Sequence, residues 1–235
     1  MARDRLIVAL DVPTAREARE LVSRIGEAAG FYKVGLQLFT AEGPEFVREL
    51  AGSGRRVFLD LKLHDIPNTV SQAVKSATEL GASMLTVHAS GGVAMLQAAA
   101  EAAGNRLSLL AVTVLTSMSD EELSQVGVAG PVQDQVLRLA ELARTAGCDG
   151  IVASARESEP LRRALGEGFA IVNPGVRPAG SQRNDQHRVA TPGNAIRAGA
   201  SHLVVGRPIT QAADPAQAAQ AIVNEIEQAQ SERLG

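Results

Sequence analysis

Two charged residues interrupt an apolar stretch of this 235-residue sequence, and their spacing is typical of an active site. Residues 56–63 have the pattern of a β-strand, in which Asp60 and Lys62 share one face and leucines occupy the other. Asp11 and Lys33 occupy similar positions in two earlier apolar runs. Because a buried charge is costly unless it is paired or needed, these residues indicate either a structural ion-pair network or a catalytic one. We favour the catalytic interpretation, since several aspartates and two of the three lysines converge there.

The composition of this cluster indicates what its lysines can do. Since positive and negative charges nearly balance, each lysine is expected to stay protonated beside ionised aspartates, and the groups are expected to titrate as a set. A protonated lysine is a proton donor and an electrostatic anchor, whereas a Schiff-base nucleophile would need a lowered pKa. We therefore expect proton donation and charge stabilisation at this site.

A second group of residues has the composition of a phosphate site. Arg177 follows the apolar run at 169–173, and Gly206 and Arg207 lie at the end of the run at 202–206. Glycine permits close approach of the backbone, and arginine offers a bidentate fork of donors to a phosphate. The intervening segment, 175–192, is long, polar and rich in glycine and proline. It is either a lid that closes over a ligand or an ordinary surface loop.

The elements that must position these residues follow a regular alternation. Short runs that are apolar at nearly every position predict parallel strands covered on both faces, at 6–12, 32–36, 56–63, 84–88, 107–115, 150–153, 169–173 and 202–206. Amphipathic patterns between them predict helices at 14–30, 41–51, 67–80, 91–104, 134–147, 157–165, 192–199 and 214–230. Eight such units predict a single (β/α)8 barrel domain over residues 1–235, with an open doubly wound sheet as the runner-up. In such a barrel the chemistry lies at the C-terminal ends of the strands.

Composition excludes several classes of protein. The chain is 45% hydrophobic and 21% charged, which is typical of a globular domain. Its net charge of −3 indicates no basic surface for nucleic acid or anionic lipid, so neither partner is expected. The apolar run at 6–10 is too short for the core of a signal peptide.

The single cysteine, Cys148, cannot form an internal disulfide and is expected to pack as a small hydrophobic residue. A cytoplasmic location is therefore expected.

Six motifs together resemble the orotidine 5′-phosphate decarboxylases of the bacterial type. Their resemblance to that family runs from the first expected strand to the last, without a large insertion or gap. The block at 60–69, DLKLHDIPNT, is the most specific of them, and the others are at 10–13, 32–35, 115–117, 174–177 and 205–208. The resemblance implies a TIM barrel that converts orotidine 5′-monophosphate to UMP, the last step of de novo pyrimidine nucleotide synthesis, with no cofactor and no metal.

The resemblance also implies a role for each charged residue of the first cluster. Lys62 would be the general acid that protonates C6 of the pyrimidine as carbon dioxide leaves. Asp60 would lie beside the substrate carboxylate. Lys33 would complete the row of charges and contact the ribose, and Asp11 would bind a ribose hydroxyl.

Further residues of the motifs would bind other parts of the substrate or another subunit. Asp65, Ile66 and Thr69 would reach into the neighbouring subunit's site, which implies a homodimer with shared active sites. Thr116 would meet the pyrimidine ring. The residues that would hold the phosphate are Arg177, Gln186, Gly206 and Arg207.

Two competing interpretations remain open. A metal-dependent sugar-phosphate enzyme of the same barrel type, such as a 3-keto-gulonate phosphate decarboxylase, would share the block at 60–69 but stabilise an enediolate on Mg²⁺. That chemistry favours a carboxylate where this chain has Lys33. A catalytically silent barrel would be expected to lack Asp60, Lys62 or Asp65, and this sequence has all three.

Overall fold

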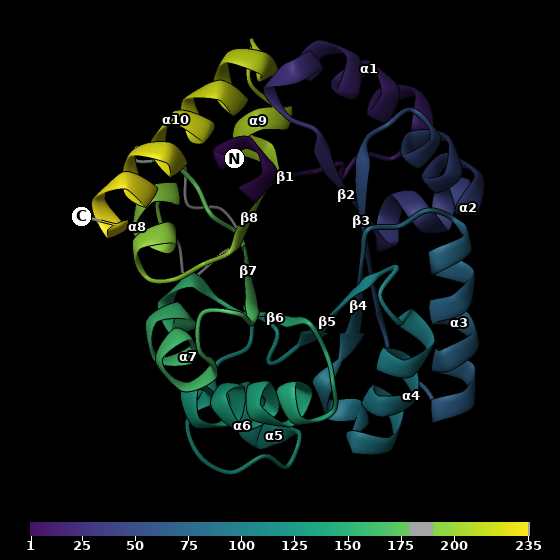
Figure 1. The fold of residues 1–235 in the computed structure, drawn as a ribbon, viewed down its shortest axis with the longest axis vertical. Helices are drawn as coiled ribbons and strands as arrows, with labels where there is room; N and C mark the ends of the chain where they lie inside the picture. The colour runs from purple at the N-terminus through teal and green to yellow at the C-terminus, as the bar shows by residue number, and fades with distance from the viewer. Residues whose placement is uncertain (179–189, 235) are drawn as a thin grey trace.

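Eight parallel strands close into a barrel in the part of the chain that the structure, a computed structural model, describes: residues 1–178 and 190–234. Each strand pairs with the next in sequence and β8 pairs with β1 (Figure 1). This confirms the predicted (β/α)8 barrel and excludes the open sheet. The strands are β1 Leu6–Ala9, β2 Phe31–Gly35, β3 Arg56–Leu63, β4 Met84–His88, β5 Ser108–Val112, β6 Gly150–Val152, β7 Ala170–Pro174 and β8 His202–Val205.

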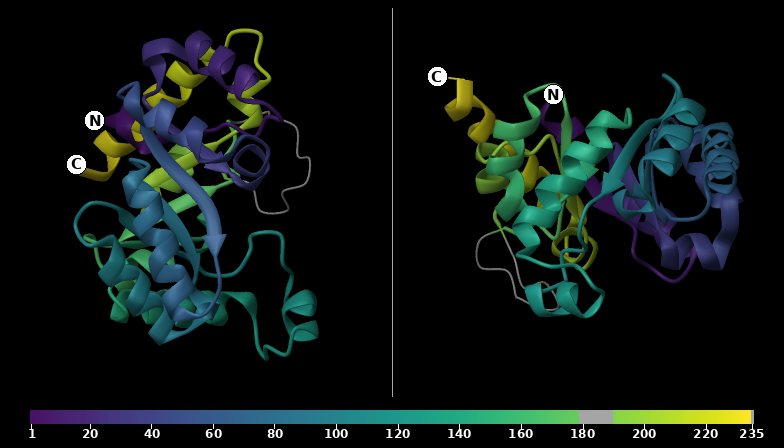
Figure 2. Two further views of the ribbon diagram at one scale, coloured as in Figure 1. Left: turned by 90° about the vertical axis from the view of Figure 1, so that its right-hand side faces the viewer. Right: turned by 90° about the horizontal axis from the view of Figure 1, so that it is seen from below.

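Helices surround the barrel on its outside, so that both faces of the sheet are covered (Figures 1 and 2). The long α10 packs against α1 and the N-terminal turn, which closes the ring between the last unit and the first. The helices are α1 Ala15–Ile25, α2 Leu36–Gly52, α3 Pro67–Glu79, α4 Val93–Ala103, α5 Asp120–Gln125, α6 Val132–Thr145, α7 Ser158–Leu165, α8 Pro192–Arg197, α9 Arg207–Thr210 and α10 Pro215–Leu234. Short 3₁₀ turns lie at Ala2–Arg5, Gly26–Ala28, Ala89–Gly91 and Ala155–Glu157.

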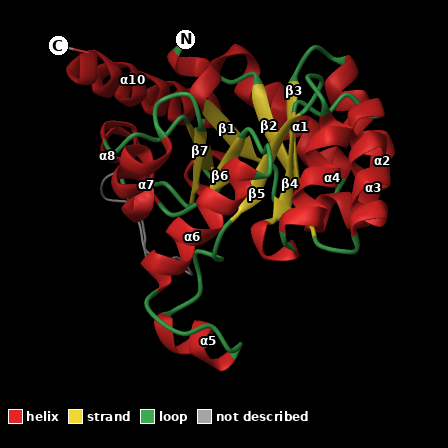
Figure 3. Cartoon of the chain, turned by 60° about the horizontal axis from the view of Figure 1, so that its bottom comes forward, coloured by secondary structure: helices red, strands yellow, loops and turns green. Residues whose placement is uncertain are grey.

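Two of these helices were not expected from the sequence. The α5 helix begins at a capping box, in which the Ser119 hydroxyl accepts from the Glu122 N–H and the Glu122 side chain accepts from the Ser119 N–H. It stands on a loop that projects from the barrel after β5 (Figure 3). The α9 helix is a single turn directly after β8, with Gly206 at its N-cap. Strict alternation of one strand and one helix therefore holds for the barrel wall but not for these insertions.

The side chains that face the barrel axis change from apolar to polar along the strands. Many of them form one apolar cluster in the interior of the barrel, which includes Phe31 and Phe58. Side chains on a strand alternate, so the next residues to face the axis are two positions further on, Lys33 and Asp60. A separate and larger apolar cluster fills the layer between barrel and helices. The barrel thus supplies an apolar floor beneath a charged upper layer.

Cys148 belongs to the apolar layer between barrel and helices, as the sequence predicted. Burial, with a smaller contribution from the Asp149 carboxylate, raises the pKa of its thiol to about 12. The thiol is therefore protonated at neutral pH and poorly nucleophilic.

His202, at the start of β8, is a titratable group inside the fold. Its ring meets the edge of Phe31 with 6.1 Å between ring centroids, and its Nδ1 is buried without a hydrogen-bond partner. Burial, with smaller contributions from the nearby Arg56 and Arg5, lowers the pKa of His202 to about 4. The folded protein therefore holds this ring neutral over a pH range in which an unfolded chain protonates it.

We predict that His202 makes folding less favourable as the pH falls from 6.5 to about 4. The unfolded chain binds a proton in this range and the folded chain does not, so on the order of 2 to 3 kcal/mol of unfolding free energy is lost by pH 4.5. Urea unfolding of the wild type and of His202→Leu at pH 7 and pH 4.5 measures this. The variant should lose less stability than the wild type, and equal losses would contradict the prediction.

Candidate active site

A cavity of about 570 Å³ opens at the C-terminal ends of the barrel strands. Its floor is apolar, since Ala9, Val152 and Val204 belong both to the interior cluster and to the cavity lining. The rest of its lining comes from the ends of six strands and the loops that follow them, and includes Asp11, Lys33, Asp60, Lys62, Thr116, Arg177, Gly206, Arg207, Thr210 and Gln211. The charged row of Asp11, Lys33, Asp60 and Lys62 therefore shares one cavity with three of the candidate phosphate ligands, Arg177, Gly206 and Arg207.

The charged residues form a row in which positive and negative groups alternate. Lys33 Nζ lies 2.8 Å from Asp11 Oδ1 and 3.7 Å from Asp60 Oδ2. Lys62 Nζ lies 2.8 Å from Asp60 Oδ1. The side chains of Lys33 and Asp60 are only 10% and 13% exposed, so the pairs at the centre of the row interact in a partly desolvated place where screening is weak. The outer members, Asp11 and Lys62, are more open to a ligand.

Gly35, at the end of β2, leaves the space that one pair of this row occupies. A Cβ at this position would lie 2.7 Å from Lys33 Nζ and 3.3 Å from Asp11 Oδ1. Any side chain would therefore displace the Lys33 ammonium from Asp11. Sequence reasoning assigned Gly35 no role, because the clash depends on the side-chain conformation of a residue two positions away.

Lys62 has an unusual backbone conformation. Its φ is +52°, and it is the only non-glycine residue with a positive φ in the described part of the chain. The pairing of β3 with β4 shifts at this point, since Leu59 lies opposite Leu85 whereas Leu63 lies opposite Val87. Such a bulge bends a strand and re-aims a side chain, and here both Asp60 and Lys62 line the cavity. The sequence predicted that Asp60 and Lys62 share the face toward the barrel mouth, but it predicted neither the bulge nor the positive φ of Lys62.

The candidate phosphate ligands lie on the loops after β7 and β8. The Arg177 side chain is buried, and its backbone N–H donates to the Ala190 carbonyl at 3.1 Å. Among the described residues, a Cβ at Gly206 would meet Ala9 at 3.6 Å and Asp11 at 3.9 Å, which are ordinary contacts. Packing within the chain therefore does not require glycine at 206, and its lack of a side chain keeps the cavity open beside Arg207.

Three predicted site residues in the described part of the chain do not line this cavity. Asp65, Ile66 and Thr69 are exposed at the start of α3, where Asp65 Oδ1 accepts from the Ile66 N–H at 2.6 Å. The cavity lining within the described residues contains none of the three. Gln186 lies outside the described residues.

Two histidines lie beside the row of charges. The rings of His64 and His88 are 5.5 Å apart, and His88 is half-buried at the end of β4, at the rim expected from the sequence. Burial lowers the pKa of His88, and the nearby His64 and Lys62 lower it further. His88 is therefore neutral near pH 7 and adds no charge to the row.

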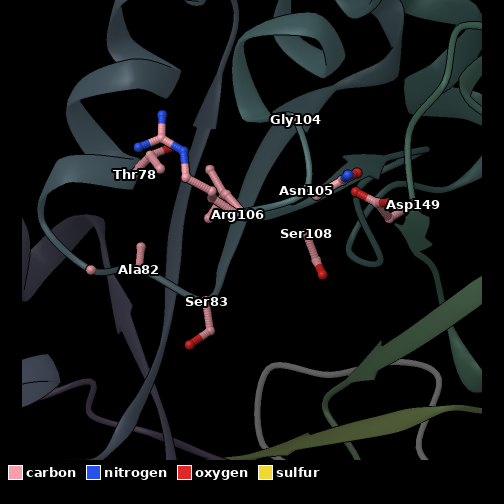
Figure 4. A pocket seen from close by; sticks show the side chains of 10 residues that line it. Thr78, Ala82, Ser83, Gly104, Asn105, Arg106, Ser108 and Asp149 are labelled. Atoms are coloured by element: carbon pink, nitrogen blue, oxygen red, sulfur yellow. The ribbon is translucent and has the colours of Figure 1, made fainter.

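A second cavity, of about 460 Å³, lies at the opposite end of the barrel, before β4, β5 and β6 (Figure 4). Its lining is short polar and small side chains together with Arg106 and Asp149. The Asp149 carboxylate already accepts from the Leu109 N–H at 2.8 Å. This cavity lacks the paired ammonium and carboxylate groups of the first one, so the C-terminal cavity is the candidate active site.

Comparison with known proteins is consistent with this geometry. The model of the Orotidine 5′-phosphate decarboxylase / HUMPS family matches residues 4–222. The orotidine 5′-phosphate decarboxylase of Moorella thermoacetica is 56% identical over 235 residues, covering 96% of this chain and 93% of that protein. That of Nitrosococcus oceani is 51% identical over 229 residues, covering 96% and 99%. The crystal structure of the Lactobacillus acidophilus enzyme has a TM-score of 0.86 at 40% identity, covering 95% and 99%. The chain therefore belongs to the orotidine 5′-phosphate decarboxylase / HUMPS family.

Proposed function

We propose that this chain converts orotidine 5′-monophosphate to UMP, the last step of de novo pyrimidine nucleotide synthesis, with Lys62 as the proton donor. The observation that carries the proposal is the alternating row of Asp11, Lys33, Asp60 and Lys62 in a cavity that also contains Arg177 and Arg207. Relatives more than half identical to this chain, over nearly its whole length, bear the name of that decarboxylase.

The chemistry requires stabilisation of a localised carbanion. When the bond between C6 and the carboxylate breaks, carbon dioxide leaves and the electron pair stays in an sp² orbital at C6, where no carbonyl can delocalise it. Without an electron-sink cofactor, the protein must stabilise this pair with charge that is already in place. Lys62 Nζ, held 2.8 Å from Asp60 Oδ1, supplies that charge and then the proton that forms the new C6–H bond.

The rest of the cavity fits the rest of a nucleotide. Its volume of about 570 Å³ is in the range of small-molecule sites. In our proposal Asp11 and Lys33 bind the ribose, Thr116 meets the pyrimidine, and Asp60 lies beside the substrate carboxylate. The phosphate ligands are Arg177, Gln186, Gly206 and Arg207. Binding energy from this remote group can then be used at the reacting carbon.

The position of Lys33 favours a reaction without a metal. Its ammonium lies between the carboxylates of Asp11 and Asp60, where a divalent cation would need to bind. The metal-dependent sugar-phosphate chemistry of the alternative interpretation favours a carboxylate on this strand. An ammonium group there repels Mg²⁺, so the alternative is the weaker of the two.

We further propose a cytoplasmic homodimer with shared active sites. Asp65, Ile66 and Thr69 are exposed outside their own cavity, and Ile66 is 67% exposed although it is a large apolar residue. Leu36 and Val93, at the starts of α2 and α4, are also exposed near the ends of neighbouring strands. A second copy would cover these apolar groups, and its cavity would receive Asp65.

No helix in the described residues is long and apolar enough to cross a membrane.

The test of the proposed reaction is the ultraviolet absorbance change of orotidine 5′-monophosphate with purified protein in excess EDTA. We expect rapid conversion to UMP, because the row of charges needs no metal. A folded protein that does not convert orotidine 5′-monophosphate in EDTA, but acts on 3-keto-gulonate phosphate when Mg²⁺ is added, would overturn the proposal in favour of the alternative.

Mixing two inactive variants tests whether the sites are shared. In a dimer of Lys62→Ala with Asp65→Asn, one site carries both changes and the other carries neither, provided that Asp65 acts across the interface. A refolded equimolar mixture should therefore recover about one quarter of the wild-type turnover. If Asp65 acts within its own subunit, mixing restores nothing, and each variant mixed with wild type serves as the control.

A further inference from the structure

Thr86 is a buried polar residue beside the row of charges, and none of the roles proposed above uses it. It lies in the middle of β4 with no exposed surface. Its hydroxyl is nevertheless fully engaged, because it accepts from the Lys62 backbone N–H at 2.9 Å and donates to Asp60 Oδ1 at 3.0 Å. One side chain from β4 therefore contacts both the backbone of Lys62 and the carboxylate of Asp60.

The contact with Lys62 falls at the bulge in β3. Between the pairs Leu59–Leu85 and Leu63–Val87, β3 advances four residues while β4 advances two, so the regular ladder is interrupted. A backbone N–H buried without a partner is costly. The Thr86 hydroxyl takes the place of a ladder carbonyl for the Lys62 N–H. It thereby stabilises the positive φ of Lys62, a conformation that costs a non-glycine residue free energy.

The contact with Asp60 falls on the oxygen that also pairs with Lys62. Asp60 Oδ1 accepts from both Thr86 Oγ1 and Lys62 Nζ, whereas Asp60 Oδ2 faces Lys33. Two donors from different strands fix the orientation of this carboxylate. Its orientation in turn decides where the Lys62 ammonium lies.

We infer that Thr86 is a positioning residue for the proposed reaction, because its hydroxyl holds the Lys62 backbone and the Asp60 carboxylate in the geometry that aims the Lys62 ammonium into the cavity. This inference rests on the proposed function. Proton transfer depends steeply on the placement of the donor, and a displacement of about 1 Å can cost on the order of 100-fold in rate. Thr86 does not line the cavity and acts through the two residues that do.

The chain offers a matched control in Thr113, directly after β5. It is also buried, and its hydroxyl donates to the Val152 carbonyl at 3.2 Å. Thr113→Val therefore removes a buried hydroxyl and its hydrogen bond from the barrel wall without a contact to Asp60 or Lys62. A loss caused only by a less stable barrel would appear in both valine variants.

The kinetic test compares Thr86→Val, Thr86→Ser and Thr113→Val. Valine keeps the shape of threonine but leaves the Lys62 N–H and Asp60 without the hydroxyl, so kcat should fall by about 10- to 100-fold with little change in KM. Thr86→Ser and Thr113→Val should stay within a few-fold of the wild type. If Thr86→Val is not recovered as folded protein, Thr86→Ala takes its place. A Thr86→Val kcat close to the wild-type value, or a serine variant as slow as the valine variant, would overturn the inference.

A second readout does not depend on activity. The chain has three lysines, so protein labelled with ¹⁵N-lysine gives three backbone amide resonances, and the Lys62→Arg variant identifies that of Lys62. In Thr86→Val the Lys62 amide should shift and exchange its hydrogen faster, while the Lys33 and Lys75 amides stay in place. An unchanged Lys62 amide would overturn the inference. If the amide responds but the wild type does not convert orotidine 5′-monophosphate, the proposed function fails and the contact stands.

Discussion

The proposed chemistry depends on keeping four charged groups side by side above the apolar floor of a barrel. Such groups are stable there only because their signs alternate, so that each ammonium has a carboxylate neighbour and each carboxylate at least one ammonium. Lys33 and Asp60 are the central members, since Lys33 contacts Asp11 and Asp60, and Asp60 contacts Lys33 and Lys62. Loss of one member would leave the charge of its neighbour without a full counter-charge in a partly buried place. The four charges therefore stabilise one another only when all are present.

The barrel makes this arrangement possible through simple geometry. Parallel strands of matching tilt bring their C-terminal ends to one rim. Because side chains alternate along a strand, Lys33 and Asp60, two positions after Phe31 and Phe58, face the same axis. Local exceptions then adjust the result. Gly35 leaves room for the Lys33 ammonium, and at the bulge in β3 Lys62 has a positive φ and lines the cavity beside Asp60. The regular barrel thus brings the charged side chains to one rim, and the irregular positions Gly35 and Lys62 affect where their charged groups lie.

Much of this organisation could be predicted from the sequence because it depends on local patterns. Apolar runs identified all eight strands, and strand-end positions identified Asp11, Lys33 and Asp60 as neighbours. The α5 helix was missed although its capping box at Ser119 and Glu122 is visible in the sequence. The positive φ of Lys62 and its contact with Thr86 could not be predicted, since both depend on a register shift between two strands. The clash at Gly35 likewise depends on side-chain packing.

The central claim is that the Lys62 ammonium performs the chemistry while other groups of the cavity bind the nucleotide. The most direct test measures kcat and UMP affinity together for Lys62→Ala, with Lys75→Ala on the exposed face of α3 as the matched control. We expect Lys62→Ala to abolish detectable turnover while the folded protein still binds UMP, and Lys75→Ala to match the wild type. A Lys62→Ala protein with a kcat near the wild-type value would contradict the claim.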